Sequence, residues 1–376
     1  MDKSSFKNPN GKIITIDNKY NVFIPNKLPI TINYSNSIIK KIELSNNYLG
    51  KLSGLINNLP NPDLFLKPYL KKEAVLSSRI EGTRSSLSDV FKMDINSKHL
   101  HNDLKEVLNY IKSLEFGLKE IESKDLTLDL ILKLNEILLY DVRGFSKDSG
   151  KIRTVQNWIG NINSSIETSV YNPPNPELVK DLLNNFVEYL NSSNENSSLV
   201  KVAILHYQFE AIHPFVDGNG RVGRLLLILY LCRCKLLDKP ILYLSEYFEK
   251  DKEKYYSSLL QVSMNSNFNS WIEYFLDGVI EQSEKTIHRV SNLLDYRSQT
   301  RKNLKDQNVN IKVLKIYDYL FSNPYIDIKK GKEILNTKNY NTSKRVILKL
   351  VELGILEEVK NKLYVAKDIN KILSDL

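Results

Sequence analysis

The spacing of apolar residues predicts a chain that is helical along most of its length. From Ser37 onward, apolar residues recur every three or four positions, which is the period of an amphipathic helix. The same pattern predicts helices at 66–80 (ending at Gly82), 102–121, 127–141, 176–190, 199–212 and 220–236, with more between 245 and 295. Residues 1–35 lack this period, and only Lys12–Ile16 is typical of a short strand.

One stretch in the middle of the chain has a different pattern. Between Gly150 and Asn161, β-branched and aromatic residues such as Val155 and Trp158 lie between glycines, which predicts a short β-hairpin. A Pro-rich segment, 172–176, ends it and leads into the next helix. The predicted fold class is therefore all-α with one small hairpin.

The C-terminal residues 311–376 have another order of elements. Three short helices, at 311–323, 328–335 and 342–353, precede two strand-like runs at 356–359 and 362–365. Three helices and a small hairpin is the order of a winged helix-turn-helix. We therefore expect three parts: an N-terminal helical segment (1–100), a core (101–297) and a winged-helix domain (311–376).

Charge is unevenly distributed between these parts. The chain has 53 Lys and Arg against 44 Asp and Glu, a net charge of +9. From Arg301 to Leu376 there are 16 basic and 9 acidic residues, so most of the excess lies there. The third helix of that domain begins Asn341-Thr-Ser-Lys-Arg345, residue types that contact phosphates and base edges. DNA binding is one expectation for this domain; packing within the chain, dimerisation or target docking are the alternatives.

Several classes of protein are excluded by composition. The longest apolar run, Leu225–Cys232, is far shorter than the roughly 20 residues that span a membrane. The first ten residues are polar and lack the apolar core of a secretory signal. Two cysteines, Cys232 and Cys234, cannot form a disulfide framework. We expect a soluble cytoplasmic protein with no membrane partner.

The segment His213–Arg224, with the sequence HPFVDGNGRVGR, concentrates groups that phosphate chemistry uses. Gly218 and Gly220 allow a tight turn with positive φ, and free N–H groups at the following helix N-terminus form an anion nest. Arg221 and Arg224 are three residues apart and share a helix face. The segment therefore predicts a polyphosphate site.

Two further residues of this segment carry candidate chemistry. Asp217, just ahead of the nest, is placed for Mg²⁺ between carboxylate and phosphate oxygens. His213 can accept a proton from an incoming hydroxyl. A glycine-containing loop with a capping Asp and surface arginines is the structural alternative. A zinc site is disfavoured, because His206, Glu210 and His213 do not form a His-Glu-x-x-His pattern.

At every specified position this segment resembles the signature of the Fic family, His-Pro-Phe-x-Asp-Gly-Asn-Gly-Arg-x-x-Arg. His206 and Phe209-Glu210 match the residues that usually precede it. The similarity extends from about residue 40 to 295. It implies a Mg²⁺-dependent protein adenylyltransferase that moves AMP from ATP onto a Ser, Thr or Tyr hydroxyl of a target protein.

The resemblance also assigns roles to individual residues. His213 is the implied general base and Asp217 the Mg²⁺ ligand; Gly218, Asn219 and Gly220 form the phosphate nest, with Asn219 at the α-phosphate, and Arg221 and Arg224 hold the β/γ end. Tyr255 and Tyr256 fall in the segment that borders the adenine, where stacking or core packing both fit. An intact Gly220 favours AMP transfer over the phosphate transfer of Doc-type members, in which a bulkier basic residue replaces it.

Two other segments match the family. Ser77-Ser-Arg-Ile-Glu81-Gly82 resembles its inhibitory helix, in which Glu81 would pair with Arg224, occupy the γ-phosphate position and misalign the α-phosphate of ATP. Gln156, Asn157, Trp158 and Ile159 fall where the family has a flap that holds the target by strand addition. A structural hairpin with Trp158 in the core is the alternative reading of the flap.

The leading hypothesis is therefore autoinhibited AMP transfer to target proteins and to the chain itself. Removal of AMP by the same site is a second enzymatic hypothesis. A DNA-binding regulator whose core senses nucleotide is a third, from another class. The family resemblance also makes a homodimer an expectation, although no interface is evident in the sequence.

Overall fold

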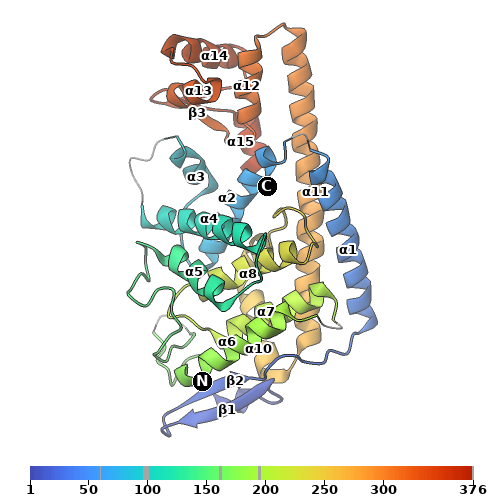
Figure 1. Cartoon of the computed structure of the whole chain (residues 1–376), viewed down its shortest axis with the longest axis vertical. Helices are drawn as coiled ribbons and strands as arrows, with labels where there is room; N and C mark the ends of the chain where they lie inside the picture. The colour runs from blue at the N-terminus through green and yellow to red at the C-terminus, as the bar shows by residue number, and fades with distance from the viewer. Residues whose placement is uncertain (60, 96–100, 161–162, 194–195, 375–376) are drawn as a thin grey trace.

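The computed structural model describes residues 1–376 except 60, 96–100, 161–162, 194–195 and 375–376. Its main body is helical, as predicted (Figure 1). In chain order the helices are α1 (Asn36–Asn57), α2 (Asp63–Ile80), α3 (Leu87–Met93), α4 (Asn102–Ile121), α5 (Leu128–Leu139), α6 (Pro176–Asn191), α7 (Ser198–Ile212), α8 (Asn219–Arg233), α9 (Ser245–Lys250), α10 (Lys252–Asn265) and α11 (Phe268–Asp306). The observed bounds of α2, α4, α6 and α7 lie within a few residues of the predicted ones.

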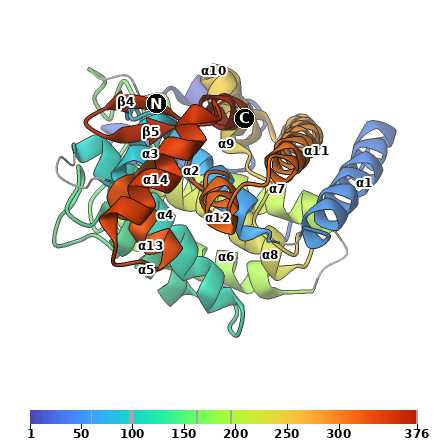
Figure 2. The ribbon, with the colours of Figure 1, turned by 90° about the horizontal axis from the view of Figure 1, so that it is seen from above.

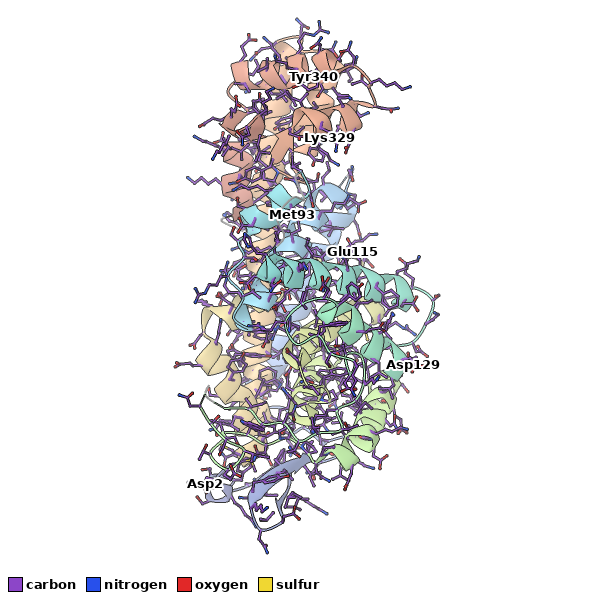
Figure 3. All side chains as sticks on the ribbon, turned by 90° about the vertical axis from the view of Figure 1, so that its left-hand side faces the viewer. Asp2, Met93, Glu115, Asp129, Lys329 and Tyr340 are labelled. Atoms are coloured by element: carbon purple, nitrogen blue, oxygen red, sulfur yellow. The ribbon has the colours of Figure 1, made fainter. Side chains whose placement is uncertain are left out.

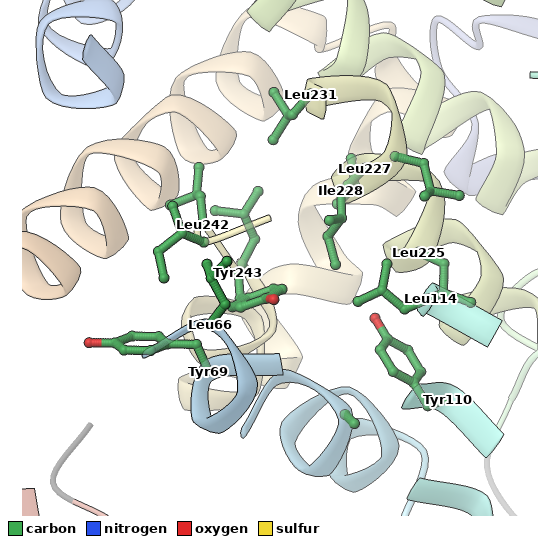
Figure 4. Packing of buried hydrophobic residues seen from close by; sticks show 14 of the residues in the cluster. Leu66, Tyr69, Tyr110, Leu114, Leu225, Leu227, Ile228, Leu231, Leu242 and Tyr243 are labelled. Carbon is green, nitrogen blue, oxygen red and sulfur yellow. The ribbon is translucent and has the colours of Figure 1, made fainter. Parts of the chain in front are cut away.

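The apolar core lies between α2, α4 and α8 and fixes their relative positions. Figure 4 shows Leu66 of α2, Tyr110 of α4, and Leu225 and Ile228 of α8 among the buried side chains that fill this space. Helix α8 is buried on nearly all sides, which is why its sequence shows an unbroken apolar run. This packing holds the N-terminus of α8 against the C-terminus of α2.

Helix α11 extends along the long axis of the molecule, and α1 packs against it (Figures 1 and 2). It has 39 residues and continues to Asp306, so the polar residues 297–306 are helical. Polar side chains there are compatible with a helix because much of this part of α11 faces solvent.

A β-hairpin forms near the N-terminus, where only its first strand was expected. Strand β1 (Gly11–Ile16) pairs antiparallel with β2 (Tyr20–Pro25). Asp17 and Asn18 have positive φ and make the turn, as Asx residues do in tight hairpins. The turn residues were the signal for the second strand, which buries Val22 and Phe23.

The prediction of a local hairpin between Gly150 and Asn161 was wrong, because the strand partner lies outside that stretch. The described residues of that stretch make no regular ladder, and Ile159 instead forms a single antiparallel bridge with Tyr171. The N–H of Ile159 donates to the Tyr171 carbonyl at 2.8 Å. The partner of Ile159 therefore lies on the far side of a longer loop, and the local pattern of residues could not identify it.

The C-terminal unit, residues 311–374, has three helices, a small sheet and a final helix. The elements are α12 (Ile311–Tyr319), β3 (Tyr325–Asp327), α13 (Ile328–Leu335), α14 (Tyr340–Glu352), β4 (Glu357–Lys360), β5 (Leu363–Val365) and α15 (Lys367–Ser374). The sheet order is β3-β5-β4, with antiparallel pairs. The three predicted helices and two strands are present; β3 and α15 were not predicted.

The C-terminal unit packs against the helical body near α2 and α3. The Asn323 side chain donates to the carbonyl of Phe91 at 2.9 Å, and the hydroxyls of Ser88 and Tyr325 are 2.8 Å apart.

Both cysteines are free thiols. Among the described residues, none of the helices combines the length and hydropathy that crossing a bilayer requires.

Candidate active site

The site is built on the loop that joins α7 to α8. His213 caps the C-terminus of α7 in a left-handed conformation (φ 50°), and Gly218 begins α8 with φ 82°. Gly220, by contrast, lies within the first turn of α8, so the expected positive φ is confirmed for Gly218 and wrong for Gly220. The side chain of Asn219 both accepts from the N–H of Phe215 and donates to its carbonyl, each at 2.8 Å. These two hydrogen bonds connect the start of α8 to the backbone of Phe215 and so hold the loop in its turn.

His213 is held by its backbone and is neutral near pH 7. Arg153, which is almost fully buried, donates from Nε to the His213 carbonyl at 2.9 Å. Burial, together with the nearby charge of Arg153, lowers the pKa of the His213 imidazole to about 4. A hydrogen bond between the imidazole and the backbone of Glu210 opposes this lowering only in part. An imidazole that is unprotonated near pH 7 has the state that a general base needs.

Three hydrogen bonds join Arg224 of α8 to the C-terminal turn of α2. Its Nε donates to Ser77 Oγ at 2.8 Å, and its Nη2 donates to the Ser77 carbonyl at 2.9 Å and to Glu81 Oε1 at 2.7 Å. Burial by itself would raise the pKa of Glu81, but the charge and hydrogen bond of Arg224 outweigh burial and lower it. We call Ser77, Glu81 and Arg224 the clamp. The structure thus brings Arg224 to two residues that precede it by 147 and 143 positions in the sequence.

The clamp lies directly over Gly220, at the start of α8. A Cβ added to Gly220 would lie 2.5 Å from Glu81 Oε1 and 3.0 Å from Arg224 Nη1. The absence of a side chain at Gly220 therefore lets the carboxylate approach the start of α8. Nη1 of Arg224 is buried and has no hydrogen-bond partner among the described residues. Gly82, directly after the clamp, has φ 97° and ends α2 as predicted.

Arg221 is held by carboxylates, and its main partner was not predicted. Its Nη1 donates to Glu106 of α4 at 2.8 Å, and both side chains are about 1% exposed. Its Nη2 lies 3.4 Å from Asp217 Oδ1. Burial raises the pKa of Glu106, although the charge of Arg221 opposes this. Arg221 is therefore fixed between α4 and the loop.

Asp217 is the accessible carboxylate of the loop, with 38% of its side chain exposed. Its backbone carbonyl accepts from Asn135 of α5 at 2.9 Å, which fixes the loop at this point. Gly144, in the loop after α5, has φ 81° and passes so close that a Cβ there would overlap Asp217 Oδ2. Asp217 thus stays open to solvent on one side and is restrained on the other.

The two tyrosines of the expected adenine border have different environments. Tyr255 is buried, stacks on Phe248 with ring centroids 4.4 Å apart, and its hydroxyl lies 2.7 Å from Nε2 of His206. Tyr255 is therefore a core residue. Its hydrogen bond gives His206 a partner inside the core, where burial lowers the pKa of His206 to about 3. Tyr256 is 47% exposed, and its ring centroid is 5.2 Å from that of Tyr255.

The four flap residues lie beside the loop. Asn157 donates to the Phe215 carbonyl at 3.0 Å, and Gln156 donates to the Pro173 carbonyl at 3.0 Å. Trp158 is 46% exposed and donates its indole N–H to the backbone of residue 164, so it is not a core residue. Ile159 makes the bridge described above.

Three buried charged residues near the site were not predicted. Two of them, Glu106 and Arg153, are described above. The third is Glu210, whose Oε1 has no hydrogen-bond partner among the described residues. Burial raises the pKa of Glu210 to about 8. Arg153 also donates to the carbonyls of Val155 and Pro174, which ties the flap to the loop. Glu210 was visible as part of the segment preceding the loop; Glu106 and Arg153 carried no local signal.

Comparison with protein families identifies this architecture. The model of the Fic/DOC family N-terminal region matches residues 39–119, and that of the Fic/DOC family matches residues 125–231, so together they cover half of the chain. The chain belongs to the Fic family. The matched residues contain both halves of the clamp and the whole α7–α8 loop.

Named relatives and solved structures agree with this assignment. Protein adenylyltransferase fic-1 of Caenorhabditis elegans is 28% identical over 209 residues, which are 55% of this chain and 37% of that protein. A probable protein adenylyltransferase of Aquifex aeolicus (strain VF5) is 27% identical over 307 residues, 80% of each chain. The chain spans little more than a third of the length of the nematode relative.

Two solved structures share the fold. A Fic family protein from Desulfovibrio desulfuricans G20 aligns with a TM-score of 0.59 and 20% identity, covering 91% of this chain and 98% of that chain. Fic-1 (residues 134–508) from C. elegans aligns with a TM-score of 0.53 and 22% identity, covering 69% and 74%. These likenesses support the Fic fold of the helical body.

Proposed function

We propose that this chain transfers AMP from ATP to hydroxyl side chains of target proteins and of itself, and that the clamp restrains this activity. The observation that carries the proposal is the position of Glu81, which occupies Arg224 directly over Gly220, beside a neutral His213. Relatives of this chain are named protein adenylyltransferases, which supports the same reaction.

In the proposed reaction, His213 takes the proton of a Ser, Thr or Tyr hydroxyl as its oxygen attacks the α-phosphorus of ATP. The new bond joins that oxygen to the α-phosphorus, and the bond from the α-phosphorus to the bridging oxygen breaks, releasing pyrophosphate. Backbone N–H groups at the start of α8 and the guanidinium groups of Arg221 and Arg224 stabilise the negative charge. The loop thus supplies both the base and the electrostatic support.

Asp217 fits the needs of a Mg²⁺ ion. Mg²⁺ is usually held by one or two carboxylates together with substrate phosphates, and Asp217 offers one partly exposed carboxylate at the nest. No group of three or more potential ligands occurs among the described residues, which suits an ion that arrives with the nucleotide. When bound, Mg²⁺ neutralises phosphate charge.

The clamp explains how the same site is restrained. A γ-phosphate and the Glu81 carboxylate are both anions that Arg224 can hold, and only one of them fits over Gly220. With Glu81 in place, the triphosphate is displaced and the α-phosphorus is misaligned with the attacking hydroxyl. Misplacement of about 1 Å can cost about 100-fold in rate.

For target binding, we propose the flap around Ile159. Among the described residues its backbone forms a single bridge, to Tyr171, and Val155 and Trp158 beside it are exposed. An extended peptide that adds to such an edge is held by main-chain hydrogen bonds. That mode places a target hydroxyl by its backbone and makes few demands on the target sequence.

The test is incubation of the full chain with α-³²P-labelled ATP and Mg²⁺, followed by measurement of label on protein. We expect Glu81→Gly to raise self-labelling about 100-fold. The matched control is Glu122→Gly, because Glu122 is also the C-cap of a helix and is exposed. The double variant Glu81→Gly/His213→Ala should lose the label.

The outcomes separate the hypotheses. No label on a folded Glu81→Gly variant would overturn AMP transfer. Label from γ-³²P-ATP instead would indicate phosphate transfer. If the main activity is AMP removal, wild type should release AMP from pre-labelled protein faster than Glu81→Gly does.

A further inference from the structure

Helix α14 of the C-terminal unit has one face that none of the described elements covers. Its buried face packs on α12 and α13 and consists of Ser343, Val346, Ile347 and Leu350. Its opposite face consists of Asn341, Lys344, Arg345 and Leu348, all exposed. Both sets follow the i, i+3, i+4, i+7 spacing of a helix stripe. We call the second set the α14 face.

The α14 face lies at one end of the molecule. Figure 3 shows Tyr340, the first residue of α14, at the end opposite to Asp2, and Figure 1 shows α14 at the same extremity. Its residues line an open hollow of about 320 Å³, together with Lys349 and Glu352. The residues of this face are therefore open to solvent.

The charge of the α14 face is not compensated within the chain. No carboxylate of the described residues lies within ion-pair distance of Lys344 or Arg345, whereas Lys349 near the other end of the helix pairs with Glu352 at 2.7 Å. The β4–β5 hairpin adds Lys360, the last residue of β4, and Lys362 in the turn, and both are exposed as well. Two basic groups on the helix and two on the hairpin suit a partner with repeated negative charges.

The topology around this face is that of a DNA reader. Helices α13 and α14 are joined by residues 336–339, a turn of the length found in helix-turn-helix motifs. The hairpin β4–β5 follows at once, with its turn at Asn361 and Lys362, both of positive φ. The sequence of elements α12, β3, α13, α14, β4, β5 therefore supports a winged helix whose second motif helix is α14.

We propose that the α14 face binds double-stranded DNA by entering its major groove, with the β4–β5 turn at neighbouring phosphates. A helix with its side chains is about as wide as that groove. Lys344 and Arg345 are suited to phosphates and guanine edges, and the amide of Asn341 to adenine. Leu348, which is 43% exposed, is placed to contact a thymine methyl group.

A protein partner fits the same face less well. A helix-binding protein groove is recognised by apolar anchors at i, i+3, i+4 and i+7. Only one of the four residues of the α14 face is apolar, and two carry uncompensated positive charge. A nucleic acid satisfies both charges, whereas an apolar groove would leave them desolvated and unpaired.

The experiment measures fluorescence anisotropy of a labelled random-sequence DNA duplex of about two helical turns, titrated with the full chain. We expect binding that weakens steeply as salt rises. Lys344→Glu/Arg345→Glu should weaken it at least about tenfold at about 50 mM salt. The matched control, Lys40→Glu/Lys112→Glu, makes the same charge change at exposed positions of α1 and α4 and should have little effect.

The proposal is overturned by any of three results: no binding at low salt, equal losses in the variant and the control, or tighter binding of an RNA duplex of the same length. The milder variant Lys344→Ala/Arg345→Ala should also bind the duplex more weakly than wild type. Its circular dichroism spectrum checks that the fold is kept. Because the readout is binding, it does not depend on whether the helical body transfers AMP.

Discussion

Helices α8 and α14 each carry two basic residues within their first two turns, and the two pairs have opposite environments. Arg221 and Arg224 of α8 are 1–2% exposed and bonded to carboxylates of α4 and α2. Lys344 and Arg345 of α14 are exposed, and no carboxylate of the described residues pairs with them. The first arrangement suits a small anion in a preorganised pocket. The second suits a large polyanion whose binding depends on salt.

The comparison shows that net charge is a poor guide to chemistry. The excess of basic residues is concentrated after residue 300, away from the proposed catalytic loop. The two arginines of the site add little to net charge because each has its own carboxylate. Positive charge that is buried and paired sets the shape of a site, whereas exposed positive charge sets association with polyanions.

The largest stability effect is expected from Arg221→Ala. It leaves Glu106 buried without its main partner, which should lower the free energy of unfolding by about 3–5 kcal/mol near neutral pH. Urea denaturation measures this. The loss should shrink as the pH is lowered, because burial raises the pKa of Glu106 and the protonated carboxyl needs no cation.

The companion variant Glu106→Gln/Arg221→Ala removes the buried charge and should recover part of that stability. If the double variant is no more stable than Arg221→Ala, the buried ion pair is not the cause of the loss.

A smaller stability loss is expected from Arg224→Ala, about 2 kcal/mol. Glu81 is 29% exposed and can turn to water, so its loss of a partner costs less than that of Glu106. Thermal unfolding would measure the change. Arg345→Ala is the matched control from α14 and should change stability by no more than about 0.5 kcal/mol. Equal effects of the two variants would contradict the comparison of the two helices.

The third prediction concerns the pH dependence of AMP transfer in Glu81→Gly. The base is active when neutral, and burial lowers the pKa of His213 to about 4. Activity should therefore persist as pH falls well below about 6.5, the ordinary histidine value, and fall only on approach to about 4. Initial labelling rates, with circular dichroism at each pH as the folding control, provide the test. An acid limb near 6.5 would contradict the buried environment of His213.

The smallest effect is expected from Lys344→Ala. Stability should stay within about 0.5 kcal/mol of wild type, because the side chain is exposed and unpaired. The slope of log affinity for duplex DNA against log salt should fall by about one. An unchanged slope would show that Lys344 does not contact phosphate.

The sequence predicted the helices well because their apolar periods are strong. The bounds of α13, Ile328–Leu335, are as predicted, and α4 and α7 agree to within one residue. The glycines and polar groups of the α7–α8 loop were also identifiable from local order. The pairing of Ile159 with Tyr171 was not, because a single bridge across a longer loop leaves no alternating pattern.

The sequence by itself determined which residues form the loop and which helix carries Glu81, since both are written in short contiguous segments. Only the tertiary structure decided how each charge is neutralised. Arg224 meets Glu81 across 143 positions, and Arg221 meets Glu106 across 115. These ion pairs form because α2, α4 and α8 pack around a shared apolar core, which brings the paired side chains together. Burial then makes each contact strong, because an unpaired charge there would cost far more than one in water.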